Sequence, residues 1–442
     1  MNHLQKLSRT FHSISSRNSR IKSLIGLKAH SGSNISLKHI SKAELQLPWQ
    51  SEFFDIYHTV RFNFGFFSKD DSDKNTDFEL VTSLNEEGRT LRDTGEFTGA
   101  LDRFQQALSI TKRLYKESHP HIEEALYWVG DTLLLLGRPH EALHYFKEAL
   151  EINKNLHKED NVDGATLMNE IGHALRDQGS LQEAFDYLFQ ALAIWKKLHI
   201  GDHGDVARAL FNVGLTLHQL RRPQEGLDYL LQALEMKRRL AQDNDLMTAQ
   251  ILNIIGIIYQ TQGKFDKGFE YLQQSFEIKQ KLLPKNHPEI AISLNNLGTI
   301  LVSLGKLQEA HDLFKEALET DSDSQGAAPP YYIAALSSLG LTCLKLRRFE
   351  EGLDYFQQLH EISLKMYPGD SLEVASSSNK IGMALFSLQR HSEAKVHFKQ
   401  AFDIYSKLDP KPLEYKKVAQ NLIFTLEKLG EVDEAKHYRS YL

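Results

Sequence analysis

Apolar residues recur along the chain in a pattern that repeats every 42 residues. In each copy a glycine lies within an apolar stripe, with an apolar residue three positions after it and, except at Ser378 in the eighth copy, another four positions before it. That spacing places the stripe on one side of an amphipathic helix. The glycines of this column are Gly88, Gly130, Gly172, Gly214, Gly256, Gly298, Gly340 and Gly382. A period held over eight copies predicts a solenoid of stacked repeats.

A second stripe begins twelve residues after each glycine. In the first copy it consists of Ala100, Phe104 and Ala107, and most later copies keep this order of small, large and small residues. Small side chains at matching positions allow two helices to approach closely, so each copy is predicted to be a helix hairpin. A lone hairpin leaves one apolar face uncovered, and stacking on its neighbours covers that face. We therefore predict an all-α solenoid of about eight to nine hairpins, with repeats beginning near residues 79, 121, 163, 205, 247, 289, 331, 373 and 413.

The chain before the repeats divides into two segments. Residues 1–43 hold eight lysines and arginines, many serines and no acidic residue, which is typical of an organellar transit peptide. The arginines favour mitochondria over plastids, and a disordered basic tail is the alternative. Residues 44–78 hold nine aromatic residues. We interpret this segment as a cap over the first repeat that ends in a polar linker over residues 69–77, with a membrane-surface anchor or a segment folded into the groove of the array as alternatives.

Two places depart from the period. The stretch from Thr320 to Pro330 contains the Pro329–Pro330 pair, and we expect it to shorten the second helix of the sixth repeat and to form a hinge or clipped loop. Near the end of the chain, Gly430 matches the turn-glycine column that begins at Gly95 only if the last period is 41 residues. We interpret this last unit as a terminal cap.

Together, these columns of Leu, Gly, Leu, Gly, Ala, Phe and Ala resemble the tetratricopeptide repeat, whose common form has about 34 residues. The longer copies here, for example Leu282–Ala291 and Leu294–Gly298, are similar to those of kinesin light chain and nephrocystin-3. The resemblance implies a right-handed α-solenoid whose first helices line a concave, peptide-binding groove. Kinesin light chains also carry a long coiled coil before the repeats, and residues 1–78 lack its heptads. With its import-like segment, the chain is more similar in architecture to mitochondrial assembly factors built from such repeats.

Polar residues at exposed positions of the first helices are the candidate peptide contacts. Five asparagines precede the glycines by three positions, and each amide suits either a peptide backbone or a neighbouring helix. The asparagines are Asn85, Asn169, Asn253, Asn295 and Asn379. Basic and polar groups follow the glycines or lie nearby, namely Arg89, Arg92, His173, Arg176, Arg208, His218 and Gln260. In the other half of the array these positions are apolar, namely Leu341, Leu344, Met383 and Phe386. We therefore predict a partner peptide with acidic groups at one end and apolar groups at the other.

Catalysis, metal binding, cofactors and membrane spanning are not expected. The pairs His140/His144 and His199/His203 have helical spacing, but neither has the adjacent glutamate of a zinc hydrolase, so we interpret them as surface histidines. The single cysteine, Cys343, occupies the leucine column, which predicts burial and excludes a disulfide framework or a cluster of thiolates. No run of apolar residues approaches the roughly 18 that a membrane span needs.

Charge and architecture together define the predicted function. Residues 1–43 carry +8 and the whole chain −6, which leaves −14 for residues 44–442 and argues against a nucleic-acid ligand. We predict a non-catalytic interaction scaffold or assembly factor in mitochondria, peripherally associated with the inner membrane or a respiratory complex. A cytosolic, kinesin-light-chain-like cargo or signalling adaptor and a plastid assembly factor are the alternatives.

Overall fold

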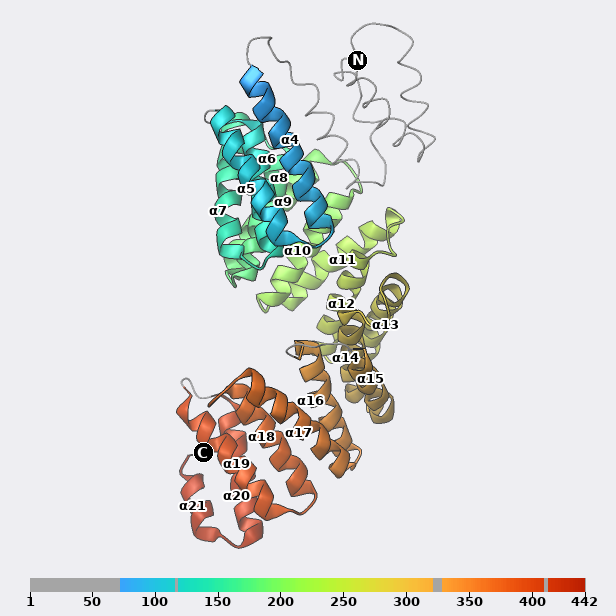
Figure 1. Cartoon of the computed structure of the whole chain (residues 1–442). Coiled ribbons are helices and arrows are strands. Elements are labelled where there is room, and N and C mark those ends of the chain that lie inside the picture. The colour runs from blue at the N-terminus through green and yellow to red at the C-terminus, as the bar shows by residue number, and fades with distance from the viewer. Residues whose placement is uncertain (1–71, 116–117, 321–327, 409–411, 442) are drawn as a thin grey trace. The chain divides into compact units, whose positions relative to one another are not determined.

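The computed structural model describes residues 72–115, 118–320, 328–408 and 412–441, and within them every regular element is an α-helix. Successive helices pair as hairpins, and each hairpin packs on the next (Figure 1). The hairpins are α4 (Ser72–Asp93) with α5 (Phe97–Leu114), α6 (Pro120–Leu135) with α7 (Pro139–Leu156), α8 (Val162–Asp177) with α9 (Leu181–Leu198), α10 (Gly204–Gln219) with α11 (Pro223–Arg239), α12 (Leu246–Thr261) with α13 (Phe265–Leu282), α14 (Pro288–Ser303) with α15 (Leu307–Glu319), α16 (Pro330–Lys345) with α17 (Phe349–Met366), α18 (Leu372–Ser387) with α19 (His391–Lys407), and α20 (Glu414–Leu429) with α21 (Val432–Arg439). The predicted all-α solenoid is confirmed for this part of the chain.

The glycine column lies where the two helices of a hairpin are closest. A β-carbon added at Gly130 would come within 2.8 Å of Cε1 of Phe146, and one added at Gly340 within 2.5 Å of the same atom of Phe356. At Gly256 it would also lie 3.0 Å from the carbonyl oxygen of Gly268, a backbone atom that cannot rotate away. The large residue of the second stripe therefore fills the space above each glycine, as the sequence pattern predicts, and the Phe or Leu side chains are buried.

Repeated local signals fix where the helices begin and end. The residue before each first helix is its N-cap, and Nδ1 of His119, His203 and His287 accepts a hydrogen bond from the backbone N–H two residues later, at 3.1–3.3 Å. The same position holds Asn161, Asp245 and Ser371, whose side chains also accept backbone hydrogen bonds. Polar caps of this kind satisfy N–H groups that have no partner within the helix.

At the amino-terminal end of the array the structure differs from the sequence prediction, and at the carboxyl-terminal end it agrees. Helix α4 already begins at Ser72, so the last six residues of the predicted linker over residues 69–77 are helical. Those residues include no glycine or proline to end the helix, and the Asp77 carboxylate accepts from the Arg113 guanidinium at 2.8 Å. The one-residue slip of the last unit is confirmed, because Gly430 takes the left-handed turn conformation (φ 78°) one position early. The predicted transit peptide (1–43) and most of the predicted cap (44–71) lie outside the described residues.

The shortened helix in the sixth repeat is also confirmed. Helix α15 has 13 residues, whereas the other second helices before the terminal one have 17 or 18. The central part of the predicted hinge, residues 321–327, lies outside the described residues, so its role stays a prediction. Within the described residues, no helix combines the length and the apolar character that crossing a membrane requires.

Candidate binding face on the first helices

The first helices of neighbouring hairpins contact one another directly. Such contacts join α6 to α8, α10 to α12, α12 to α14, α14 to α16 and α18 to α20, whereas the second helices pack mainly against first helices. We call the solvent-facing sides of these first helices the inner face. All of the predicted contact residues lie on first helices, α4 included, although Asn85, Asn169 and Asn295 are buried there.

The asparagine column lies at the junctions between hairpins. Asn212, Asn296 and Asn421 donate from Nδ2 to Oδ1 of Asn169, Asn253 and Asn379 of the preceding hairpin, at 2.8, 2.9 and 3.2 Å. Asn295 donates instead to the backbone carbonyl of Tyr331 at 2.9 Å. These four asparagines thus make the neighbouring-helix contact that the sequence left open as an alternative. Contact of the column with a peptide stays a prediction, and Asn169 at 3% exposure offers little surface for it.

The arginines of the first hairpin are paired with acids of the second. Arg89 lies 3.5 Å from Glu124, and Arg92 lies 3.1 Å from Asp131. Both guanidinium groups also lie over the indole ring of Trp128, at 4.9 and 5.3 Å from its centroid. The positive charges of these arginines are therefore neutralised by acidic residues of the neighbouring hairpin. This end of the inner face is polar rather than strongly basic.

A second polar cluster lies on α8 and the helices beside it. The Glu170 carboxylate accepts from Asn169 Nδ2 at 3.0 Å and lies 3.5 Å from Nδ1 of His173. Burial lowers the pKa of His173 and that of the Arg176 guanidinium, because both lose solvation of their charged forms. Arg208, on α10, pairs with Asp205 at 3.0 Å. Positive and negative groups are thus interleaved here too.

Asp131 is a carboxylate of this face whose pKa lies well above its ordinary value. Burial and, to a smaller extent, the like charge of Glu170 raise its pKa, the positive charge of Arg92 lowers it, and the net result is a pKa of about 6. Burial is the largest of these causes, so the Arg92 ion pair does not fully replace the water that Asp131 loses. The sequence places Asp131 between Arg89 and His173 in the column just after the glycines, which was the available signal for including it.

Several inner-face atoms are buried and have no hydrogen-bond partner among the described residues. They include Asn85 Oδ1, Arg89 Nε, Arg176 Nη1, His218 Nδ1 and Asn295 Oδ1. Buried polar atoms in folded proteins nearly always have a partner, so such atoms indicate water or a bound ligand. Four of these five residues were predicted as groove contacts from the sequence, and His218 belongs to the same columns.

The inner face changes character toward the carboxyl end. Gln260 is half-buried on α12, and beyond it the corresponding positions become apolar, with Leu341 exposed on α16 and Phe386 half-buried on α18. Phe424 on α20 is 54% exposed, and its ring centroid lies 5.7 Å from that of Phe386. Sequence analysis missed Phe424 because the one-residue slip of the last unit moves it out of the 42-residue column.

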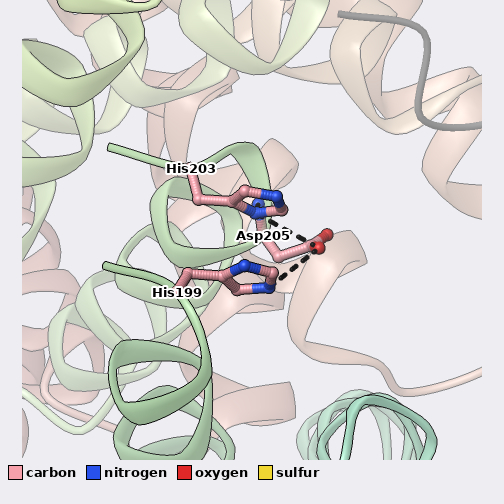
Figure 2. Close-up of side chains that lie close together, drawn as sticks. All are labelled: His199, His203 and Asp205. Carbon is pink, nitrogen blue, oxygen red and sulfur yellow. Dashed lines mark hydrogen bonds and ion pairs between the residues drawn. The ribbon is translucent and has the colours of Figure 1, made fainter. Parts of the chain in front are cut away.

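The histidine pairs differ in their surroundings. Figure 2 shows the rings of His199 and His203 stacked beside Asp205, with ring centroids 3.5 Å apart. Asp205 Oδ2 lies 3.9 Å from His199 Nε2 and 3.4 Å from His203 Nδ1. That Nδ1 atom caps α10, and Arg208 binds the other oxygen of Asp205, so both groups already have structural roles. His140 and His144 are part of no metal-ligand cluster within the described residues.

Comparisons with known proteins agree with this architecture. A model of the tetratricopeptide repeat matches residues 79–155, 164–239, 247–323 and 331–407. The apo form of the quorum sensor NprR from B. thuringiensis is 17% identical with a TM-score of 0.56, and the match covers 80% of this chain and 94% of NprR. This likeness shows the fold alone.

Two further solved structures are similar over shorter stretches. Nearly identical TPR-like repeats of a putative kinesin light chain from Podosopora anserina are 19% identical (TM-score 0.43), covering 47% of this chain and 99% of that one. BtubC (BKLC) from P. vanneervenii is also 19% identical (TM-score 0.42), covering 59% of this chain and 95% of that one. Among curated proteins, no sequence matches.

Proposed function

The chain belongs to the tetratricopeptide repeat family, and from this premise we propose that it is a non-catalytic scaffold that binds an extended segment of a partner protein along its inner face. The fold is typical of interaction scaffolds, since a stack of hairpins offers a long surface built from repeated positions. The observation that carries the proposal is the surface of the first helices, where polar side chains such as Arg208 and apolar ones such as Leu341 and Phe424 are accessible to a partner.

The partner segment has both polar and apolar groups. Arg89, Arg92 and Arg208 already form ion pairs with acidic residues of this chain. Acidic groups of the partner segment therefore displace those carboxylates when they bind the arginines. Arg176 differs, since no ion pair within the described residues engages its guanidinium, although its Nη1 atom is itself buried. Apolar groups of the segment contact Leu341, Phe386 and Phe424 at the other end.

The proposed site of action is the mitochondrion. Residues 1–43, with eight basic and no acidic residues, support import. Import combined with long repeats gives an architecture similar to that of tetratricopeptide repeat protein 19 of mitochondria, a maturation factor for respiratory complex III. By this similarity the chain would act as an assembly or maturation factor, peripherally bound at the inner membrane or at a respiratory complex. A cytosolic cargo or signalling adaptor and a plastid factor are the competing proposals.

Localisation is tested with the full chain and a form lacking residues 1–43, each carrying a carboxyl-terminal fluorescent protein. Import predicts mitochondrial signal for the full chain and diffuse cytosolic signal for the shortened one. Diffuse signal for both favours the cytosolic adaptor, and plastid signal in a plant cell favours the plastid factor. None of these outcomes bears on the inner face.

Partner binding is tested by affinity capture followed by quantitative mass spectrometry. The double variant Arg92→Gln/Arg176→Gln removes two inner-face cations, and we expect at least about a tenfold loss of the proteins captured by the native chain. The matched control Arg138→Gln/Arg222→Gln also removes two cations, each bonded to a glutamate three residues later at the start of a second helix. Equal capture by the folded inner-face variant would show that this face is not the binding surface.

A further inference from the structure

A histidine, the cysteine and a glutamate converge between the sixth and seventh hairpins, away from the inner-face residues discussed above. His311 comes from α15, Cys343 from α16 and Glu351 from α17, and one ligand atom of each lies within 4.8 Å of the others. Cys343 is fully buried and His311 is 5% exposed, whereas the Glu351 side chain is 38% exposed. A small group could therefore reach the cluster from the Glu351 side.

The two ring nitrogens of His311 each face a carboxylate oxygen. Nδ1 lies 3.2 Å from Asp312 Oδ1, and Nε2 lies 3.1 Å from Glu351 Oε1. A neutral imidazole carries one N–H, so it can donate to only one of these oxygens. The second nitrogen then points a lone pair at an oxygen lone pair, unless the ring is doubly protonated or a cation lies between them.

The surroundings of His311 match those of a metal-binding histidine. Such a ring commonly donates its outer N–H to a carboxylate, which fixes the tautomer and aims the other nitrogen at the metal. Asp312 is in position to accept from Nδ1. The other ring nitrogen, Nε2, then faces Oε1 of Glu351 and the Cys343 sulfur. These three atoms are a nitrogen, an oxygen and a sulfur, each able to bind a metal ion.

We propose that hairpins six and seven are joined by a zinc ion bound to His311 Nε2, Cys343 Sγ and a Glu351 carboxylate oxygen, with Asp312 orienting the imidazole. Nitrogen, sulfur and oxygen ligands at about 2.0–2.3 Å suit zinc, whereas magnesium and calcium prefer oxygen alone. Tetrahedral bonds of that length separate ligand atoms by about 3.3–3.6 Å, close to the 3.1 Å between Nε2 and Oε1.

Binding releases a proton from the thiol. Burial and, to a smaller extent, the charge of Glu351 raise the pKa of Cys343 to about 12, so the free site holds a thiol. Zinc replaces that proton, the S–H bond breaks as the Zn–S bond forms, and the proton leaves to solvent. Arg348, 3.8 Å from the second oxygen of Glu351, leaves Oε1 for the metal. Water completes the four-coordinate shell.

The test uses cobalt(II) as a coloured substitute for zinc on the full chain after treatment with a chelator. A cobalt–thiolate bond gives a charge-transfer band in the near ultraviolet, and Cys343 is the only cysteine in the sequence. We expect this band at one equivalent of cobalt, its loss on addition of zinc, and its absence in Cys343→Ser. Asp312→Asn should weaken metal binding by about tenfold or more while keeping the band at saturation.

His203→Ala is the matched control, because it removes a ligand from the other histidine cluster and should leave the band unchanged. Zinc should also raise the Tm of the native chain but not that of Cys343→Ser. A folded native chain that shows no charge-transfer band, or a band that survives Cys343→Ser, would overturn the proposal. Loss of the band in His203→Ala with retained folding would likewise assign the metal to other ligands.

Discussion

The two halves of the inner face are built from the same helix hairpins but differ in the side chains that they expose. In hairpins one to four, arginines and carboxylates on neighbouring first helices are interleaved, as in the Arg92–Asp131 pair at 3.1 Å. In hairpins seven to nine, the corresponding surface is apolar and includes the Phe386–Phe424 contact at 5.7 Å. The glycine column runs through hairpins of both halves, so packing inside a hairpin is independent of what its first helix shows to a partner.

This difference bears on how each half can bind. The apolar half gains free energy simply by removing exposed Leu and Phe side chains from water. The polar half must first break ion pairs such as Arg89–Glu124, so it gains little unless the partner replaces each bond. We infer that the apolar half contributes more of the affinity and that the polar half discriminates between partners.

The largest expected effect tests whether the two halves share their packing. Gly130→Leu in the polar half and Gly382→Leu in the apolar half should each lower the free energy of unfolding by about 1–3 kcal/mol. Even a β-carbon there would lie 2.8 Å from Phe146 Cε1 or 2.7 Å from Phe398 Cδ1. Urea denaturation measures both. Gln106→Leu, at an exposed position of α5, is the control and should change stability by less than about 0.5 kcal/mol. A cost confined to one half would show that the scaffold is not uniform.

The next effect belongs to the polar half alone and depends on pH. Asp131 has a folded-state pKa of about 6, above its ordinary value of 3.8, so its charged form is disfavoured in the folded protein. The resulting loss of stability is absent below about pH 4, develops between pH 4 and 6, and is complete above pH 6. Asp131→Asn should therefore stabilise the protein at pH 8 by about 1–2 kcal/mol. This is less than the roughly 3 kcal/mol of the full shift, because Arg92 loses its counter-charge.

Thermal unfolding at pH 4 and at pH 8 measures this difference, with Tm of Asp131→Asn compared with that of the native chain. The gain should shrink toward zero or reverse at pH 4. Asp228→Asn, on the exposed side of α11, is the control and should stay within about 0.5 kcal/mol of the native chain. A variant that is less stable than the native chain at pH 8 would mean that the ion pair with Arg92 outweighs the burial of Asp131.

The sequence predicts the hairpins well because their signals lie within one repeat. A glycine and the Phe or Leu sixteen residues later, such as Gly88 and Phe104, are brought together by a single turn. The same holds for N-caps such as His119 and for the shortened α15 before its proline pair. Each of these features depends on local helix geometry, which a periodic pattern expresses directly.

The candidate site was predicted less completely because its contacts cross from one hairpin to the next. Asn169 meets Asn212, which belongs to a different column of the following repeat. Likewise, the compensating acids Glu124 and Asp131 stand one repeat after the arginines they bind. The offset between repeats depends on how hairpins stack, and a period along the chain does not specify it. The His311, Cys343 and Glu351 cluster was missed for the same reason, since its members come from three helices.

The smallest expected change in stability comes from substitutions in the turns between the two helices of a hairpin, one turn in each half. The turn position that is glycine in five repeats holds Arg221 in the polar half and Arg347 in the apolar half, with φ of 60° and 61°. Left-handed backbone is costly for a residue with a β-carbon, and glycine adopts it freely. Arg221→Gly and Arg347→Gly should therefore each stabilise the protein by about 0.5–1 kcal/mol. The reciprocal change Gly305→Ala, at φ 77°, should destabilise it by a similar amount. Denaturation midpoints of the three variants provide the measurement. Equal gains at positions 221 and 347 would show that the halves differ only in the side chains of their inner face, whereas a gain at one and a loss at the other would locate a difference in the backbone itself.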